Sequence, residues 1–542
     1  MNTGASLTKF SLIGFLAFVS LFIVWNPNHG FSDYESQRAA IYAGELSLPT
    51  GIFLHLKRFY PAYLFEFKLI QLISDQIWPF FIFVALQYLT ATYLLSKLAI
   101  DQNIERWRIL ALLVLITLTP AFANTWASVT GCERGIIFYL SIFIYSYSKY
   151  TQTGNKSWGI IAIISANIAI YYKEPVFIAI LVFIMFRIVI LYLNKHKKTS
   201  FIDFILIFCS ASFISIYLAM IHLYGGVDTY GHMNAEQIPS ALNILNYITN
   251  EPILGLIAFP LGVIRLRTIL KYPEKADAFL DPLLFAGVGY ASVFIALNMY
   301  AANYWAPIYI FTFLPILKYT GLIIKNIKSK ILNIGKMVVS LLIILNSIPL
   351  ALHILTSQKI NPSIESAALD RLGEIIKERE QNRKVNIFLD GITPELTAHP
   401  SDQKFDRDSY FNIGAHLKRR GLSEANFELK SQIIRKDILY VPDKIPDNNN
   451  YSAYSSVIPS IPETGDYLLI TPQSSIYRTN ESFESMLPFY EILHESSASS
   501  ASIPNFAARN LIKYILIKSN HQNWLKDTNL FKRPHYMILK RK

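Results

Sequence analysis

Acidic and basic side chains gather in three short stretches at the edges of apolar segments, where they could transfer a proton beside a bound phosphate. The stretches are Asp33, Tyr34 and Glu35; Glu133 and Arg134; and Lys173 and Glu174. A carboxylate can accept the proton of a hydroxyl nucleophile, and lysine or arginine can pair with phosphate oxygens. Ionisable residues at membrane depth are costly, so they are candidate functional residues by default. The pattern therefore predicts a site with a carboxylate base and fixed cations.

The first stretch also has a structural interpretation. Ser32 to Glu35 matches a capping box, in which Glu35 returns a hydrogen bond to the backbone of the capping serine. Asp33 and Glu35 are two residues apart, so they cannot share one face of a helix. Only one of them can point into a cavity, and we favour Asp33 as the base.

Each of the other stretches also has a purely structural interpretation. Glu133 and Arg134 could simply pair with each other, and Lys173 could extend its ammonium to the membrane surface. Lys57 and Arg58 add cations near the first stretch, at the membrane edge where a lipid phosphate would reside. Three acid–base clusters on one membrane face nevertheless favour a site for an anionic substrate over chance.

The composition of the whole chain explains how these residues would be positioned. The 542 residues are 52% hydrophobic and only 16% charged, which predicts a polytopic α-helical membrane protein. About eleven apolar segments are long enough for transmembrane helices, and the short fourth or fifth could be re-entrant. The segments are 10–25, 77–96, 108–126, 135–149, 157–172, 175–193, 202–223, 252–269, 282–300, 304–323 and 337–355. Residues 10–25 end at Trp25, and Trp25, Asn26 and Pro27 do not form a small-residue cleavage site, so we expect a retained span rather than a signal peptide.

Lysine and arginine concentrate in alternate connections, which predicts that those connections are cytoplasmic. The external loop 26–77, the loop 224–251 and the carboxyl-terminal tail then lie on the opposite side. The basic residues fall in clusters between apolar segments, so the net charge of +12 does not indicate a nucleic-acid partner. The two cysteines, Cys132 and Cys209, lie at a loop edge and inside a span, so no disulfide is expected.

A different composition begins after the last apolar segment. A helix is expected over Ser363 to Glu380, followed by short apolar runs bounded by Pro, Asp, Asn and Gly, which is typical of strands. The runs are 385–389, 438–441, 467–470, 490–493, 514–517 and 536–539. The sequence thus predicts a transmembrane catalytic domain over 1–358 and an external soluble α/β domain over 359–542. The second part has no nucleotide-binding glycine pattern and no metal-ligand spacing of Cys or His.

This order of parts resembles the GT-C glycosyltransferases, which use polyprenyl-phosphate sugars. The shared features are a first span, a long external loop that opens with Asp33 and Glu35, a second acid at Glu133, about eleven spans and a soluble external domain. Lys173, Glu174 and Pro175 are similar to a short Lys-x-Pro element of the bacterial enzymes that add glucose to O-antigen, the serotype-converting Gtr type. Where many members have adjacent acids, this chain has Tyr34 between Asp33 and Glu35.

The resemblance implies a hexosyltransferase of the bacterial inner membrane, with its active site and carboxyl-terminal domain in the periplasm. A polyprenyl-phosphate sugar would be the donor, and a glycan or lipid-linked acceptor such as O-antigen of lipopolysaccharide would receive the sugar. The site residues fall into three groups. The groups are catalytic Asp33, Glu35 and Glu133; donor phosphate-binding Lys57, Arg58, Arg134 and Lys173; and substrate-binding Glu174 and Tyr34. No cofactor is expected, with a divalent metal left open, and the implied partners are membrane lipids, a flippase and a donor synthase.

Two other functions fit a multispanning chain with basic external residues. A polysaccharide polymerase usually lacks a large soluble tail. A lipid-linked glycan transporter is expected to have inverted repeats and helices broken near the middle of the bilayer. A non-enzymatic scaffold would not need acids on one face. Convergence of Asp33, Glu133 and Lys173 beside a lipid-accessible cavity would favour the transferase.

Overall fold

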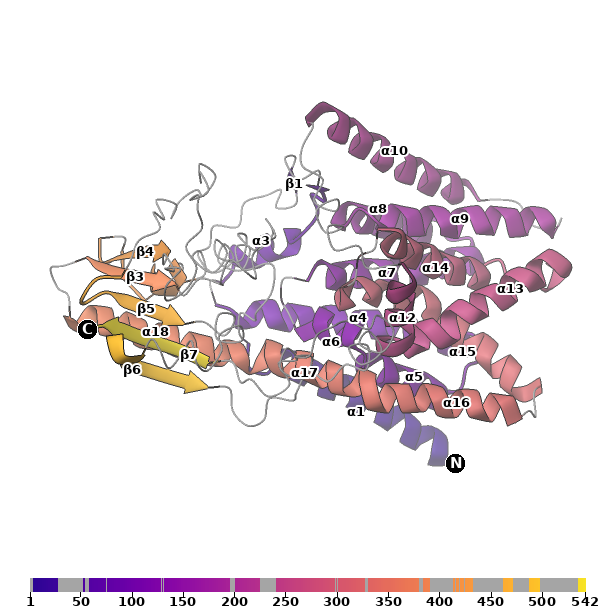
Figure 1. Cartoon of the computed structure of the whole chain (residues 1–542). Helices are drawn as coiled ribbons and strands as arrows, with labels where there is room; N and C mark the ends of the chain where they lie inside the picture. The colour runs from indigo at the N-terminus through magenta and orange to yellow at the C-terminus, as the bar shows by residue number, and fades with distance from the viewer. Residues whose placement is uncertain are drawn as a thin grey trace.

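The computed structural model is a helical bundle joined to a smaller part that contains a sheet (Figure 1). The structure describes residues 3–27, 52–53, 58–74, 76–127, 129, 131–194, 200–224, 240–297, 299, 301–326, 330–379, 384–389, 413–414, 416–418, 420–423, 425–431, 462–470, 487–497 and 535–542. Within these residues most of the chain is helical. We call the end of the bundle nearer to the sheet the sheet end, and the opposite end the far end.

The helices of the bundle follow the apolar segments of the sequence. They are α1 (Thr3–Val24), α4 (Trp78–Asp101), α5 (Arg106–Thr117), α6 (Pro120–Ala127), α7 (Cys132–Thr153), α8 (Lys156–Tyr172), α9 (Val176–Leu193), α10 (Phe201–Tyr224), α12 (Ser240–Asn250), η3 (Leu254–Ala258), α13 (Phe259–Lys271), η4 (Pro273–Lys275), α14 (Leu280–Ala296), η5 (Ala302–Trp305), α15 (Ala306–Asn326), α16 (Lys330–Leu342), η6 (Ile343–Ser347) and α17 (Ile348–Lys359). Every predicted apolar segment contains helix. The prediction of about eleven spans is not confirmed as a number, because length and composition alone single out fewer helices.

Four helices in the described part of the chain are long and apolar enough to cross a membrane. They are Trp78–Asp101, Val176–Leu193, Phe201–Met220 and Leu332–Leu355. The number rises to six if each of two bent helix pairs is one span. Shorter apolar helices lie at Thr8–Val24 and Leu280–Ala296. The described residues therefore contain several apolar helices that could cross a membrane, and the finer count stays a prediction.

Both bent pairs break at a proline. The helices Arg106–Thr117 and Pro120–Ala127 meet at 74°, and Ile244–Asn250 meets Leu254–Lys271 at 115°. Proline cannot donate its backbone N–H and disfavours a helical residue before it, so Pro120 and Pro252 each end one helix and begin the next. The short segments 135–149 and 157–172, either of which could have been re-entrant, form the continuous helices α7 and α8. The predicted loop 224–251 contains a helix over Ser240–Asn250.

The connection after α1 is partly described. Two short strands, β1 (Ile52–Phe53) and β2 (Arg58–Phe59), pair in antiparallel register, and the short helix α3 (Phe65–Gln71) follows. Leu64 caps α3 with a left-handed backbone at φ 58°, which is an outlier for a bulky side chain. The backbone N–H of Ala62 donates to the carbonyl of Tyr171 over 3.0 Å, which ties this connection to the end of α8.

The carboxyl-terminal part is a mixed five-stranded sheet packed against one helix. Its elements are α18 (Asn361–Arg379), β3 (Val385–Leu389), β4 (Phe427–Ser431), β5 (Tyr467–Ile470), η7 (Leu487–Phe489), β6 (Tyr490–Ser497) and β7 (His535–Arg541). The strand order is β4-β3-β5-β7-β6, with β3 parallel to both β4 and β5 and β7 antiparallel to β5 and β6. Leu369 and Leu372 of α18 pack on Ile387, Leu469 and Ile538 in one buried cluster.

A polar junction lies where the bundle continues into the sheet-containing part. The ammonium of Lys359, at the end of α17, donates to the carbonyl of Ile23 at 2.6 Å, and the amide of Asn26 donates to the carbonyl of Lys359 at 2.5 Å. Lys359 also lies over the ring of Phe81, with Nζ 4.3 Å from the ring centroid. The end of α1, the start of α4 and the end of α17 therefore meet at the sheet end of the bundle.

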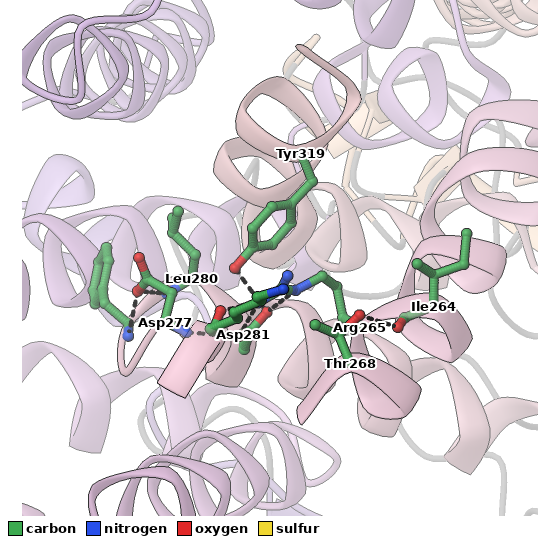
Figure 2. Close-up of polar contacts among 9 residues, drawn as sticks. Ile264, Arg265, Thr268, Asp277, Leu280, Asp281 and Tyr319 are labelled. Carbon is green, nitrogen blue, oxygen red and sulfur yellow. Dashed lines mark hydrogen bonds and ion pairs between the residues drawn. The ribbon is translucent and has the colours of Figure 1, made fainter. Parts of the chain in front are cut away.

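A buried ion pair fixes three helices at the far end. Figure 2 shows Arg265 of α13 opposite Asp281 of α14, with Tyr319 of α15 above them. Arg265 donates from Nε and Nη2 to the two oxygens of Asp281 at 2.7 Å each, and the hydroxyl of Tyr319 donates to the same carboxylate at 2.7 Å. Asp281 is completely buried. The charge of Arg265 is therefore compensated by Asp281.

Candidate functional site

Glu133 and Lys173 form a buried ion pair near the sheet end of the bundle. Glu133 lies on the first turn of α7, and its Oε1 accepts a hydrogen bond from Nζ of Lys173. Lys173 has an extended backbone between α8 and α9, and Pro175 is the N-cap of α9. The two side chains are 0% and 3% exposed. The ammonium of Lys173 is therefore not extended to the membrane surface.

Two further groups complete the surroundings of this pair. Nζ of Lys173 lies 3.9 Å from the centroid of the Tyr304 ring, a cation–π contact. The Asn303 side chain interacts with the Glu133 carboxylate, and it also accepts from the amide of Asn124 at 3.2 Å. The second oxygen of Glu133, Oε2, is buried and has no donor in hydrogen-bond geometry among the described residues. A buried carboxylate oxygen of this kind can accept a hydrogen bond from a substrate hydroxyl.

Arg134, the next residue, is bonded to a different part of the bundle. Its Nη1 donates to Oε1 of Glu66 at 3.1 Å and to Oε1 of Gln87 at 2.6 Å, while its Nε donates to the carbonyl of Val129 at 2.8 Å. The guanidinium also lies 4.0 Å from the centroid of the Phe67 ring. Arg134 is 0% exposed, so it joins α7 to α3 and α4 from inside the protein.

These contacts decide between two interpretations of the sequence. A mutual pair of Glu133 and Arg134 was one alternative, and it is wrong: each residue has a partner on another element. Consecutive residues of a helix point about 100° apart, so the two side chains reach different neighbours. Two neutralised pairs, Glu133 with Lys173 and Arg134 with Glu66, lie on either side of the first turn of α7.

Tyr172 connects the second pair to the turn that carries Lys173. Its hydroxyl donates to Oε1 of Glu66 at 2.7 Å, and its ring lies against Gly135. A Cβ at Gly135 would be 2.3 Å from Cζ of Tyr172. The close approach of the ring to α7 therefore needs glycine at this position.

Glu174 has a structural contact to the strand β2. Its Oε1 accepts a hydrogen bond from the backbone N–H of Phe59 at 3.2 Å. The neighbouring residue Arg58 pairs through its backbone with Phe53 in β1. The hairpin that carries Arg58 is therefore joined to the same turn as Lys173, which brings two of the predicted site segments together.

A further buried carboxylate lies where the two bent helix pairs meet. Glu251, just before Pro252, accepts from the hydroxyl of Tyr309 at 2.5 Å and from the backbone N–H of Ala121, in the first turn of α6, at 2.8 Å. It is completely buried, and no lysine or arginine contacts it among the described residues. Because α6 also carries Asn124, which bonds Asn303, this carboxylate and the Glu133 pair belong to one polar region.

The remaining predicted residues lie outside the described residues. They are Asp33, Tyr34, Glu35 and Lys57. The predicted roles of these residues stay predictions. Within the described ranges, no three His, Cys, Asp or Glu side chains lie together in a way that could hold a metal ion.

Several residues of the candidate site were not predicted from the sequence. Glu66 interrupts an aromatic run, and Glu251 directly precedes a proline between two apolar segments. Each of these features could have identified the residue as a candidate from the sequence. No sequence feature identifies the other contact residues, which are Gln87, Asn303 and Tyr304. Single polar residues in apolar helices are common, and only the packing shows which of them are in contact.

No protein-family model matches the sequence, and no curated protein matches it.

Proposed function

We propose that the chain is a GT-C-type glycosyltransferase of the bacterial inner membrane. It would transfer a sugar, with glucose as the first candidate, from a polyprenyl-phosphate donor to a surface glycan such as O-antigen on the periplasmic face. In this proposal all eleven apolar segments cross or enter the bilayer. The sheet-containing part lies outside, where it recognises the acceptor.

One observation carries the proposal: the buried Glu133 carboxylate lies beside the ammonium of Lys173, and its Oε2 has no donor in hydrogen-bond geometry among the described residues. A carboxylate oxygen can orient an acceptor hydroxyl, and a neighbouring cation can stabilise the charge of a departing phosphate. The Arg58 hairpin is fixed to the Lys173 turn through Glu174 and Phe59, which supports a phosphate site at the same place.

The reaction divides the acids by role. Glu133 is held ionised by Lys173, which makes it a weaker base, so it would orient the acceptor. A carboxylate of the first connection, Asp33 in preference to Glu35, would take the proton of the acceptor hydroxyl. The hydroxyl oxygen then forms a bond to the anomeric carbon while the bond from that carbon to the phosphate oxygen breaks. Polyprenyl phosphate leaves with the electron pair, and Lys57, Arg58 or Lys173 compensates its charge, whereas Arg134 is already bonded to Glu66 and Gln87.

The experiment is a transfer assay with purified protein, polyprenyl-phosphate glucose and lipopolysaccharide acceptor. Asp33→Asn is expected to lower the rate by roughly 10²–10⁴ because it removes the proton acceptor but keeps the shape. Glu35→Gln is expected to be milder, since an amide can still serve a capping box. Glu105→Gln, at an exposed position before α5, is the control and should match the unmodified protein.

Two outcomes contradict the proposal. A protein that inserts and folds but transfers no sugar to any acceptor is not this enzyme. If Asp33→Asn and Glu35→Gln are both fully active, the first connection is not catalytic. If Glu35→Gln alone is inactive, the two acids exchange roles.

A second candidate, a transporter of lipid-linked glycans, is favoured by one observation. Two proline-broken helix pairs meet at the buried Glu251, and broken helices are typical of transporter binding sites. Proteoliposomes loaded with a fluorescent lipid-linked sugar separate the candidates. Movement of the lipid between leaflets that is lost in Glu251→Gln, without transfer to an acceptor, would favour transport.

A further inference from the structure

The carboxyl group of Glu251 is buried inside the bundle where the two bent helix pairs meet. The residue is 0% exposed. Its Oε1 accepts a hydrogen bond from the backbone N–H of Ala121 at 2.8 Å, and its Oε2 accepts from the hydroxyl of Tyr309 at 2.5 Å. Both donors are uncharged, so these bonds satisfy the oxygens without supplying a counter-ion.

The bend after α12 keeps this side chain in the interior. The backbone carbonyl of Glu251 accepts from the N–H groups of Leu254 and Gly255 at 2.9 Å each. A Cβ at Gly255 would lie 2.7 Å from Cα of Ile248, so the chain folds back on α12 with a glycine at the point of close approach. The carboxyl group therefore stays buried as long as the bend is intact.

No lysine or arginine among the described residues compensates Glu251. The segments that supply its contacts contain no basic residue and are described without a gap; they are 116–127, 247–258 and 301–316. Lys318, the first cation further along α15, lies nine residues from Tyr309, which is roughly 14 Å at 1.5 Å per residue. Lys359, the cation of α17, donates to the carbonyl of Ile23 at the sheet end.

The other titratable groups on the elements around the bend do not supply a counter-ion either. Besides Tyr309 and the two lysines, these elements carry Tyr247 on α12, Tyr304 on η5, Tyr319 and Lys325 on α15 and His353 on α17. Phenols are uncharged near neutral pH, and an unperturbed histidine is mostly uncharged above about pH 6.5. Lys325 lies beyond Lys318 on the same helix, and the charges at the start of α7 are paired with Lys173 and Glu66.

These surroundings favour a proton over other cations. A carboxyl group that is buried without a counter-ion commonly binds a proton instead of keeping its charge. The start of α6 compensates a carboxylate only in part, because Pro120 has no N–H and the N–H of Phe122 points to Oγ1 of Thr119 at 3.4 Å. A metal ion needs several oxygen ligands, whereas the backbone N–H of Ala121 points at the carboxyl group.

The hydroxyl groups around Glu251 suit both protonation states. The hydroxyl of Thr119 contacts both the carboxyl group and Tyr309, and it donates to the carbonyl of Ile116 at 2.7 Å. Without the proton, Tyr309 donates to Oε2 of Glu251. With the proton on Oε2, Glu251 donates to Tyr309, whose own proton turns to Oγ1 of Thr119. Each donor has an acceptor in both states.

We propose that Glu251 is a proton-binding site, which takes up a proton from water and releases it again between the two bent helix pairs. A proton needs no cavity, so the complete burial of the carboxyl group is compatible with this role. The site does not depend on the proposed transferase activity, because it follows from the contacts of the carboxyl group alone.

Infrared spectra of the full-length protein in lipid nanodiscs measure this proton directly, since a carboxylic acid has a C=O stretching band that a carboxylate lacks. We expect Glu251→Gln to remove such a band at pH 7, where a glutamate in water, with a pKa of about 4.3, is ionised. The band should decrease reversibly as the pH is raised above 7. Glu105→Gln, at an exposed position, and Glu133→Gln, at a buried position with a cation, are the controls. Each should remove a carboxylate signal only.

The hydroxyl partner gives the acid band a signature that a merely structural carboxylate would not have. Tyr309→Phe removes this partner, so the band should shift to higher frequency but remain. Tyr290→Phe, which removes another buried phenol, is the matched control and should leave the band in place. The amide of Glu251→Gln can accept from Ala121 and donate to Tyr309, so this variant is expected to fold. Thermal unfolding of each variant checks that expectation.

Three results would overturn the proposal. The first is a difference spectrum in which Glu251→Gln removes only a carboxylate signal at pH 7. The second is an acid band that does not change at any pH at which the protein stays folded, because such a group never releases its proton. The third is an acid band that Tyr309→Phe leaves unshifted. If Glu251→Gln does not fold, the Tyr309→Phe spectrum decides the question.

Discussion

Breaking the buried pair of Glu133 and Lys173 gives the most direct test of the site's geometry. Lys173→Met keeps the length and the apolar stem of the side chain but removes its ammonium. Glu133 is then left completely buried without a cation. An uncompensated buried charge typically costs about 3–5 kcal/mol of unfolding free energy. The cation–π contact of Lys173 with Tyr304, about 2 kcal/mol or more when it is desolvated, is lost as well.

The double variant Glu133→Gln with Lys173→Met distinguishes loss of a charge partner from loss of packing. Its amide carries no charge, so most of the destabilisation caused by Lys173→Met should disappear. A pair of neutral side chains in place of a buried ion pair is often neutral in stability or better. The coupling energy from the complete double-mutant cycle should therefore amount to several kcal/mol.

Reversible unfolding in mixed micelles, followed by tryptophan fluorescence, provides the free energies. Lys149→Met is the matched control, since Lys149 pairs with Asp101 at 2.7 Å but both side chains are partly exposed, at 21% and 23%. Such a pair is worth about 0–1 kcal/mol. If Lys173→Met costs no more than Lys149→Met, Glu133 is not paired as described. If the double variant is as unstable as the single one, packing and not charge explains the loss.

Two other predictions follow from the packing and the charges. Gly135→Ala should shift the Tyr172 ring, since the new Cβ would be 2.3 Å from it, and should lower the apparent melting temperature. Gly14→Ala in α1, where the new Cβ would have no neighbour within 4 Å, should leave the melting temperature unchanged or raise it. In the sheet-containing part, burial and the charge of Arg371 lower the pKa of His494, so the unfolded chain binds a proton that the folded chain does not. Stability should therefore fall as the pH decreases below about 6.5, and His494→Gln should make thermal unfolding less sensitive to pH between 7.5 and 5.5. An unchanged slope would show that this histidine is not responsible.

The sequence predicted the positions of the helices well, because apolar composition reports them directly. The helix over 363–380 and the strands at 385–389, 467–470, 490–493 and 536–539 also have counterparts in α18, β3, β5, β6 and β7. Strand β4 was missed because Phe427 to Ser431 alternates charged and apolar residues over only five positions. The strands predicted at 438–441 and 514–517 lie outside the described residues.

The candidate site was predicted only in part. Glu133 and Lys173 were both chosen from the sequence, but their pairing was not, because forty residues separate them. The contact of Arg134 with Glu66 depends on how α3 folds back on α7, which no local pattern indicates. The sharp bends were also missed, although a proline stands at each of them. The spacing of apolar residues predicts where a helix lies. A sharp bend between two helices depends instead on how they pack against neighbouring helices.

The two ion pairs at the start of α7, Glu133 with Lys173 and Arg134 with Glu66, cannot form at the same time while the chain is being synthesised. Glu66, the partner of Arg134, lies 68 residues upstream, whereas Lys173, the partner of Glu133, lies forty residues downstream. As the chain emerges from the ribosome, Arg134 can meet its partner at once, while Glu133 has to wait until the turn after α8 has been made. During that interval Arg134 has its partner, whereas the carboxylate of Glu133 has no cation to pair with. We expect the first turn of α7 to pack stably only after Lys173 has been synthesised. The turn between α8 and α9 would then be the last segment that this end of the bundle needs in order to fold.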